Sequence, residues 1–163
     1  MKTKLLMMSF LTMVMSFFGC SAGAQTQMPQ GELLELEYKR SGTMAGYAYY
    51  VRVERTDNGD VVLRAMQESY GPLYEKTLTT EELQGFVQII EEEQMYDYGY
   101  SYEPEFDVLD GYAWGFTARF ADTAIISHGS NAGPSGDGLR RIREYSEQLA
   151  KEGQPFAGEP ELE

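Results

Sequence analysis

The chain has 163 residues and a formal net charge of −13, with 13 basic residues, 26 acidic residues and one histidine. This balance argues against binding to nucleic acid or to anionic membrane surfaces, because both select for patches of Lys and Arg. The single cysteine cannot form an internal disulfide, and the sequence has no Cys/His cluster of the kind that holds zinc or redox metals. The fold must therefore rely on its hydrophobic core, and no cofactor is expected.

The first residues have the pattern of an export signal. Lys2 and Lys4 precede an apolar run over residues 5–18, and small residues follow it. The run is shorter than the ~20 residues that a membrane-spanning helix needs. No later segment is long and apolar enough to span, so we expect a signal peptide at residues 1–19 and no transmembrane helix in the mature chain.

The cleavage point determines what becomes of Cys20. The Gly19-Cys20 step is typical of a lipoprotein signal, in which the cysteine becomes the first mature residue and carries a lipid anchor. The alternative cut follows Ala24 and leaves Gln25 first, which would give a secreted protein without an anchor. We favour lipidation, because a lone cysteine directly after an apolar run otherwise has no role. A bacterial cell-envelope location follows, periplasmic or surface-exposed, with the lipid bilayer as a partner.

The remaining chain divides into three parts. Residues 20–31 are small and polar and predict a flexible tether. Residues 32–152 contain no repeat and no second linker, so they are expected to form a single domain. Residues 153–163 carry two prolines and three glutamates, which is typical of a disordered acidic tail.

Strand patterns fill the first half of this domain. Apolar and polar residues alternate over 34–39 and 47–54, and a further apolar run covers 61–66. Asn58-Gly59 lies between the second and third runs, and this dipeptide is typical of a β-hairpin because both residues tolerate positive φ. A fourth strand is expected over residues 73–78.

Two amphipathic helices are expected, one before and one after a second hairpin. Thr79 and Glu82 fit a capping box, and apolar residues follow at helical spacing as far as about Gln94. Residues 112–120 alternate around an aromatic face, and residues 125–128 return as the hairpin partner. The last helix is expected from about residue 135 to residue 151. The predicted fold is α+β, with the order ββββ-α-ββ-α and an antiparallel sheet of about five to six strands covered on one face by both helices.

Tyrosines recur at every second position in the connection after the first helix. They are Tyr96, Tyr98, Tyr100 and Tyr102. Rows of aromatic side chains stack on sugars or form protein interfaces, where they provide contact area at a low cost in side-chain entropy. The alternative is an edge segment whose tyrosines pack on the sheet. This row is the candidate binding surface.

An acidic loop follows the tyrosines and contains Glu103, Glu105, Asp107 and Asp110. Calcium prefers such oxygen ligands, but the spacing is not that of an EF-hand, because Val108 stands where the loop needs glycine. Glu103 and Glu105 could also act as a pair of hydrolytic carboxylates. A solvated loop is the favoured interpretation, and the four residues are only weak calcium candidates.

The glycine-rich segment 129–138 leads into the last helix, where free N–H groups could hold an anion. The candidate ligand residues around it are His128, Ser130, Asn131 and Arg140. No phosphate-binding glycine motif is present. We favour a strand-to-helix connection in which glycines and Pro134 set the turn and Ser135 or Asp137 caps the helix.

Catalysis is not expected at His128. Ser127, Ser130 and Asp137 lie near it in the sequence and suggest a catalytic triad. However, a triad depends on fixed geometry, and no nucleophile elbow flanks these residues. No catalytic residue is therefore assigned.

Three segments suggest a family resemblance. They are "MYDYGYSY", "VLDGYAWGFTARF" and "ISHGSNAGPSGDGLRRI". With them, residues 31–151 resemble small, uncharacterised exported or lipid-anchored proteins of Bacteroidota-type envelopes. The resemblance implies an envelope location and one domain, and it implies no activity, so no site residue follows from it.

These features lead to one favoured function and two alternatives. We expect a non-enzymatic envelope lipoprotein that binds a protein or a glycan through its tyrosine-rich surface. The first alternative is a module that binds calcium or a small ligand through the 103–110 or the 129–138 loop. A hydrolase that uses His128 or a carboxylate pair is the least favoured.

Overall fold

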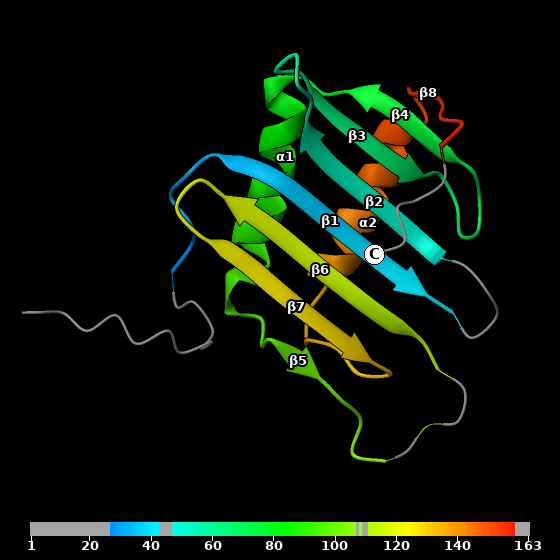
Figure 1. Ribbon diagram of the computed structural model, residues 1–163. Helices are drawn as coiled ribbons and strands as arrows, with labels where there is room; N and C mark the ends of the chain where they lie inside the picture. The colour runs from blue at the N-terminus through cyan, green and yellow to red at the C-terminus, as the bar shows by residue number, and fades with distance from the viewer. Residues whose placement is uncertain (1–26, 43–46, 107, 109–110, 159–163) are drawn as a thin grey trace, which may run out of the picture.

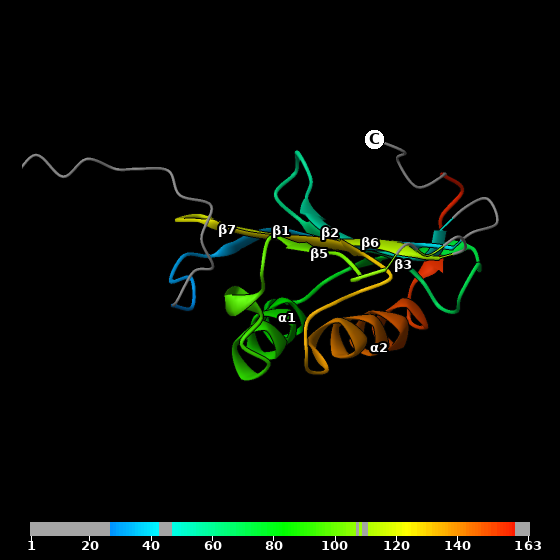
Figure 2. The same cartoon turned by 90° about the horizontal axis from the view of Figure 1, so that it is seen from below.

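The computed structural model describes residues 27–42, 47–106, 108 and 111–158. Its strands are β1 (Leu33–Ser41), β2 (Tyr47–Arg55), β3 (Val61–Met66), β4 (Leu73–Thr77), β5 (Ser101–Tyr102), β6 (Ala113–Phe120), β7 (Ala124–Ser130) and β8 (Gln154–Pro155). Its helices are α1 (Thr80–Glu92), the 3₁₀ turn η1 (Met95–Asp97) and α2 (Gly138–Ala150). Together they form one sheet with both α-helices on the same face (Figure 1, Figure 2).

The sheet has eight strands in the order β5-β7-β6-β1-β2-β3-β4-β8. Neighbouring strands are antiparallel except β5 and β7, which are parallel. The predicted mixed α+β fold is confirmed, but the expected count of five to six strands is wrong. The two additional strands, β5 and β8, have two residues each and lie at opposite edges of the sheet. Strands this short carry no alternating pattern from which a sequence could reveal them.

The first hairpin is confirmed, with a different turn from the expected one. The Gly59 N–H donates to the Thr56 carbonyl at 2.9 Å, and the Thr56 N–H donates to the Asp60 carbonyl at 2.8 Å. Gly59 has a φ of +87°, whereas Asn58 does not adopt positive φ. This is the pattern of a turn followed by a glycine bulge, in which only one residue needs the left-handed conformation.

The predicted capping box of α1 is also present. The Glu82 N–H donates to the Thr79 hydroxyl at 3.2 Å, and the Thr79 N–H donates to the Glu82 carboxylate at 2.8 Å. At the other end of α1, Glu92 and Glu93 face the unfavourable pole of the helix dipole. Arg141 of α2 pairs with them at 2.7 and 2.8 Å. The second helix therefore supplies the positive charge that balances the two carboxylates at the end of the first helix.

The core lies between the sheet and the two helices. Strand residues that point toward the helices are fully buried, among them Leu36, Val51, Val53, Leu63 and Ala118. They pack with residues of the helices, among them Phe86, Ile90, Ile142 and Leu149. In the part of the chain that the structure describes, neither helix has the length and hydropathy to cross a membrane.

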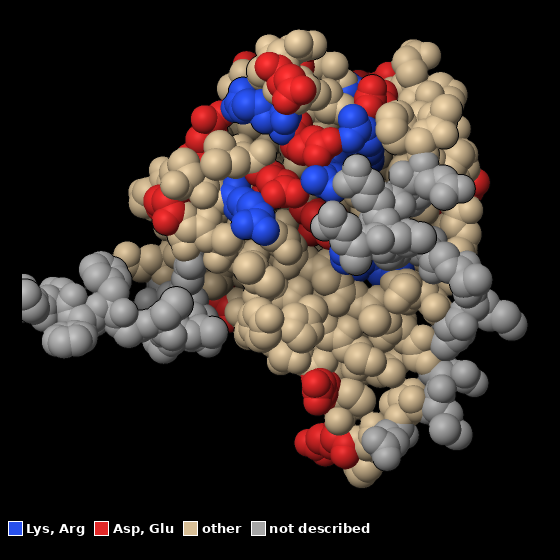
Figure 3. All heavy atoms as spheres, in the orientation of Figure 1, with Lys and Arg blue, Asp and Glu red and all other residues tan. Residues whose placement is uncertain are grey.

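The face of the sheet opposite the helices carries a ladder of ion pairs. Its members alternate in sign across five neighbouring strands: Arg119, Glu35, Arg52, Glu54, Arg64 and Glu75. The nitrogen–oxygen distance is 3.1 Å from Arg119 to Glu35 and 2.8 Å from Arg64 to Glu75. Figure 3 shows the basic and acidic side chains interleaved over one part of this face. Since each member has a partner of opposite charge, the ladder is already neutralised within the protein.

Both ends of the described chain are held on the domain. The Gln30 and Gly31 N–H groups donate to the Asp122 carboxylate at 2.9 and 3.0 Å, and these bonds hold its pKa below the usual value. The last residues of the expected tether therefore contact the β6–β7 turn. At the other end, β8 pairs with β4 inside the segment expected to be a disordered tail, and the Arg64 guanidinium lies 4.8 Å from the centre of the Phe156 ring.

Candidate functional site

The four tyrosines of the predicted binding surface do not share a face. Tyr98 is only 8% exposed, whereas Tyr100 is 58% exposed. The η1 turn breaks the alternation, because Gln94 before it takes a φ of +50° and the chain changes direction. Tyr96 and Tyr102 are half-buried. Binding of a protein or glycan through this segment stays a prediction, and Tyr100 is the member that is open to a partner.

Tyr98 and Tyr102 have structural contacts instead. The Tyr98 hydroxyl accepts a hydrogen bond from the Gly138 N–H, and burial raises the pKa of Tyr98 to about 12. The Tyr102 hydroxyl accepts a hydrogen bond from the Gly99 N–H at 2.8 Å, and its ring lies 5.8 Å from that of Trp114. These two tyrosines fix the connection between the helices against the core.

The candidate residues around the glycine-rich segment are divided between the two faces of the sheet. His128 and Ser130 are exposed and alternate with the buried Ser127 and Gly129, so they lie on the face without helices. The His128 ring makes an edge contact with Tyr100, with centroids 4.8 Å apart. The residues of the suggested triad are therefore not brought together on one face.

Asn131 has a defined structural role. Its side-chain oxygen accepts a hydrogen bond from the Tyr112 N–H at 2.9 Å, and its own N–H donates to the Tyr112 carbonyl at 2.9 Å. It adopts a φ of +54°, a left-handed conformation that Asn tolerates better than most residues. Asn131 thereby holds Tyr112 at the start of β6.

The glycines of segment 129–138 let the chain pack against Trp114. The indole N–H donates to the Ala132 carbonyl at 2.7 Å. A Cβ atom at Gly129 would lie 2.7 Å from both that carbonyl oxygen and the indole nitrogen, which only glycine avoids. This packing agrees with the interpretation of segment 129–138 as a strand-to-helix connection. Asp137 precedes α2 as expected, but its side chain makes no capping hydrogen bond and pairs with Arg140 at 2.9 Å.

The acidic loop gives no metal site in the described residues. Glu105 is exposed and Glu103 is half-buried, while Asp107 and Asp110 lie outside the described residues. Within residues 27–42, 47–106, 108 and 111–158, no group of three or more His, Cys, Asp or Glu residues could hold a metal ion. The calcium prediction, which depends on all four residues, is not tested by the structure.

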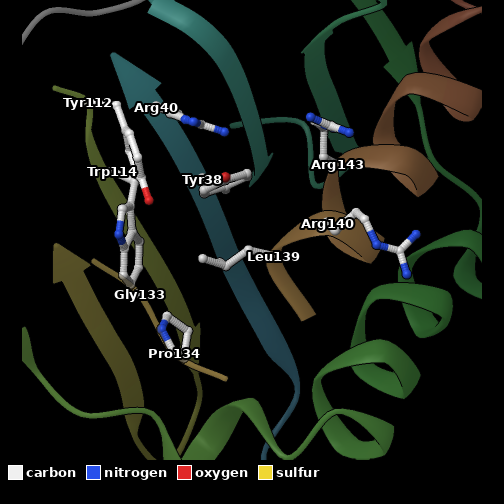
Figure 4. Close-up of a pocket in the computed structure, with 9 residues that line it drawn as sticks. All are labelled: Tyr38, Arg40, Tyr112, Trp114, Gly133, Pro134, Leu139, Arg140 and Arg143. Atoms are coloured by element: carbon white, nitrogen blue, oxygen red, sulfur yellow. The ribbon is translucent and has the colours of Figure 1, made fainter. Parts of the chain in front are cut away.

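A pocket lies between the helix-facing side of the sheet and α2 (Figure 4). Its volume is about 310 Å³. It is lined by Tyr38, Arg40, Tyr112, Trp114, Gly133, Pro134, Leu139, Arg140 and Arg143. These residues come from the end of β1, the start of β6, the glycine-rich segment and the first half of α2. None of them is acidic, although the whole chain is strongly acidic.

One end of the pocket is cationic. The Arg40 guanidinium lies over the Tyr112 ring, 4.1 Å from its centroid, and no ion pair joins Arg40 to a carboxylate in the described part of the chain. Arg143 makes a long ion pair with Glu147, 3.5 Å. This pair is made by the buried Nε atom and is too long for a hydrogen bond, and the terminal nitrogens of Arg143 have no partner among the described residues. Both arginines thus keep hydrogen-bonding capacity.

Tyr38 lies between these two arginines (Figure 4). Burial raises the pKa of Tyr38, and the nearby positive charges of Arg40 and Arg143 oppose that rise. The hydroxyl therefore stays protonated at neutral pH, and it has no hydrogen-bond partner within the described ranges. It is available to donate to a bound anion.

The other end of the pocket is apolar. Trp114, Pro134 and Leu139 line it, together with the backbone of Gly133 (Figure 4). Arg140 belongs to the lining but is already paired with Asp137 and Glu144, at 2.9 and 2.8 Å. Of the predicted ligand residues, Arg140 is the one that the structure brings to the pocket. His128 and Ser130 lie on the opposite face of the sheet, and the Asn131 side chain bonds the backbone of Tyr112.

A second cavity, of about 400 Å³, lies between residues 28–33 and α1. Among the described residues, its lining contains Glu32 and Glu91 but no basic residue, and the remaining side chains are apolar or uncharged. Its described lining therefore offers no positive charge to an anion. The pocket beside α2 combines charge, aromatic rings and unused hydrogen-bond donors, and is the better candidate site.

Comparisons with protein-family models, with curated proteins and with solved structures each found no match to the chain.

Proposed function

We propose that the domain binds a small anionic molecule in the pocket between β1, β6 and α2. The observation that carries this proposal is the Arg40 guanidinium, which faces the pocket without a carboxylate partner among the described residues. A half-buried charge is costly unless an opposite charge and hydrogen bonds compensate it. In a chain with 26 acidic residues, a pocket whose described lining contains three arginines and no carboxylate favours an anion from outside.

The geometry supports binding rather than catalysis. Guanidinium groups recognise carboxylates and phosphates through paired, charge-assisted hydrogen bonds. Arg40 and Arg143 supply such donors, and the Tyr38 hydroxyl supplies a third. Among the described residues, the lining contains no Asp, Glu, His, Ser or Cys that could act as a nucleophile or general base. A binding module is therefore the function that this site supports best.

The place of action belongs to the same proposal. Cys20 and the whole leader lie outside the described residues, so the support comes from the sequence alone. The Gly19-Cys20 step and the resemblance to envelope proteins favour a lipid-anchored protein of the bacterial cell envelope. An anchored binding module would retain its ligand close to the membrane.

The mass of the mature N-terminus tests the anchor. We expect intact-protein and peptide mass spectrometry of the native protein to show Cys20 as the first residue, with acyl chains attached. A mature chain that starts at Gln25 would contradict the anchor and leave a secreted protein, without affecting the proposed pocket.

Replacing Arg40 by glutamine tests the pocket. We expect Arg40→Gln to weaken binding of small carboxylates by at least about tenfold, because charge-assisted hydrogen bonds contribute roughly 1.5–3 kcal/mol each. The chain has a single tryptophan, Trp114, which lines the pocket, so its fluorescence and calorimetry both report binding.

The matched control is Arg119→Gln. It removes the same charge from the opposite face of the sheet, where Arg119 pairs with Glu35. We expect this variant to bind as the unchanged protein does. Equal losses in the two variants would reduce the role of Arg40 to general electrostatics and would contradict the proposed site. Binding through Arg40 should also weaken with added salt, because screening acts on a partly exposed charge.

A further inference from the structure

The two ends of the pocket restrict the class of ligand. The cationic end contains Arg40, Arg143 and the Tyr38 hydroxyl, and the apolar end contains Trp114 and Leu139 (Figure 4). A ligand that fills the pocket must place an anionic group at the cationic end and the rest of its structure, here called its body, at the apolar end. The groups that line the apolar end determine the chemical class of this body.

Among the described residues, the apolar end offers one free polar side-chain group, the Tyr112 hydroxyl, which points toward Trp114 (Figure 4). Pro134 and Leu139 carry none, and the indole N–H of Trp114 is already bonded to the Ala132 carbonyl at 2.7 Å. Most hydroxyls of a sugar ring would leave water without gaining a side-chain partner among the described residues, which lowers affinity. An apolar body loses no hydrogen bonds at this end and gains contact with the indole, the proline ring and the leucine.

The charge of the lining favours a monoanion. Arg140 is neutralised by Asp137 and Glu144, and Arg143 is partly neutralised by the long pair with Glu147. Arg40 is the lining arginine for which the described chain offers no carboxylate. A single carboxylate balances this charge, whereas a phosphate dianion would leave excess negative charge in a partly desolvated site.

The volume limits the size. The pocket of about 310 Å³ corresponds to roughly ten water molecules at their volume in the liquid, and it is at the lower end of the range for ligand pockets. This volume suits one ring or a short branched chain with a carboxylate.

From these four observations we infer that the ligand is a small monocarboxylic acid with an apolar body of about one ring. The carboxylate lies between Arg40 and Arg143, and the body lies against Trp114 and Leu139. This inference rests on the proposed function, since it names the class of the anion that the same pocket binds.

The test is a titration of the full-length protein with five probes by calorimetry and Trp114 fluorescence. The probes are benzoate, cyclohexanecarboxylate, acetate, glucuronate and inorganic phosphate. We expect the two acids with apolar rings to bind at least tenfold more tightly than the other three. Leu139→Asn, which keeps the size but adds an amide, should lower the affinity for benzoate about tenfold and leave that for acetate unchanged. Melting curves show whether this variant is folded, and the ranking of the probes on the unchanged protein is decisive without it.

The outcomes separate the inference from the proposed function. If glucuronate, acetate or phosphate binds as tightly as benzoate, and Arg40→Gln abolishes that binding, the pocket binds anions but the inference about the apolar body is overturned. If none of the five probes binds in a manner that depends on Arg40, the proposed function fails together with the inference.

Discussion

Replacing Trp114 by alanine is expected to lower the free energy of unfolding by about 3–5 kcal/mol, the range for deleting a large aromatic side chain from a core. Trp114 is 5% exposed, contacts the ring of Tyr102, and is held by the Ala132 carbonyl. Its loss would leave a cavity beneath segment 129–138. Since a domain of this size has roughly 5–15 kcal/mol of stability, the variant should lose a large part of it.

Trp114→Phe separates packing from hydrogen bonding. It keeps an aromatic ring but removes the N–H that donates to Ala132 at 2.7 Å, so we expect a loss of about 1 kcal/mol from the missing bond, with a further loss for the smaller ring. Chemical denaturation followed by circular dichroism is the appropriate measurement, because both variants lack the only tryptophan. A midpoint for Trp114→Ala equal to that of the unchanged protein would show that the indole does not support the fold.

The same variants link the fold to the proposed site. Gly133, Pro134 and Tyr112 line the pocket. Trp114 and Asn131 hold this part of the chain through their bonds to Ala132 and Tyr112. The affinity for the ligand should therefore fall in Trp114→Ala even where the protein remains folded, because the apolar end of the pocket has lost its largest side chain.

The elements that could be predicted from the sequence are those that local patterns determine. The hairpin around Gly59, the capping box at Thr79 and the aromatic face of β6 each depend on residues a few positions apart. The two-residue strands β5 and β8 could not be found in this way, because they exist only where the sheet offers an edge to pair with. Pro155 in β8 would even argue against a strand, although an edge tolerates it.

The tyrosine row shows how the same pattern can mislead. Alternation over residues 96–102 indicates one face of a strand, but the left-handed Gln94 and the η1 turn redirect the chain before β5 begins. Tyr98 then points into the core and Tyr100 to the surface. Periodicity describes a face only where the backbone conformation is continuous.

The candidate pocket could not be predicted from local sequence patterns, because its residues come from distant parts of the chain. Arg40 and Tyr112 lie far apart in the sequence and meet because β1 pairs with β6. Arg143 and Glu147 are four residues apart in α2 and form an ion pair, and this local spacing says nothing about the position of Arg143 beside Tyr38. The ion-pair ladder likewise depends on strand register, which brings Arg52 opposite Arg64 with Glu54 between their charges. Arg140 could be predicted because it lies two residues after the glycine-rich segment 129–138.

Gly138→Ala is expected to destabilise the domain by about 1–3 kcal/mol, although alanine normally favours a helix over glycine by up to about 1 kcal/mol. Gly138 is the first residue of α2 and is buried. A Cβ atom there would overlap the Tyr98 hydroxyl and lie 2.8 Å from the Met95 Cγ atom. Met95 is fully buried and cannot move aside without disturbing the core.

The matched control is Gly115→Ala in β6. A Cβ atom at this position meets only the Lys39 side chain, at 3.9 Å, so we expect no loss of stability. The double variant Gly138→Ala/Tyr98→Phe identifies the cause, because removing the hydroxyl removes the closest contact. In that background the cost of alanine at position 138 should fall by at least about 0.5 kcal/mol, the size of coupling expected between residues in contact. The coupling follows from the denaturation midpoints of the unchanged protein, Gly138→Ala, Tyr98→Phe and the double variant. Strictly additive effects would mean that Tyr98 does not require a glycine at the start of α2.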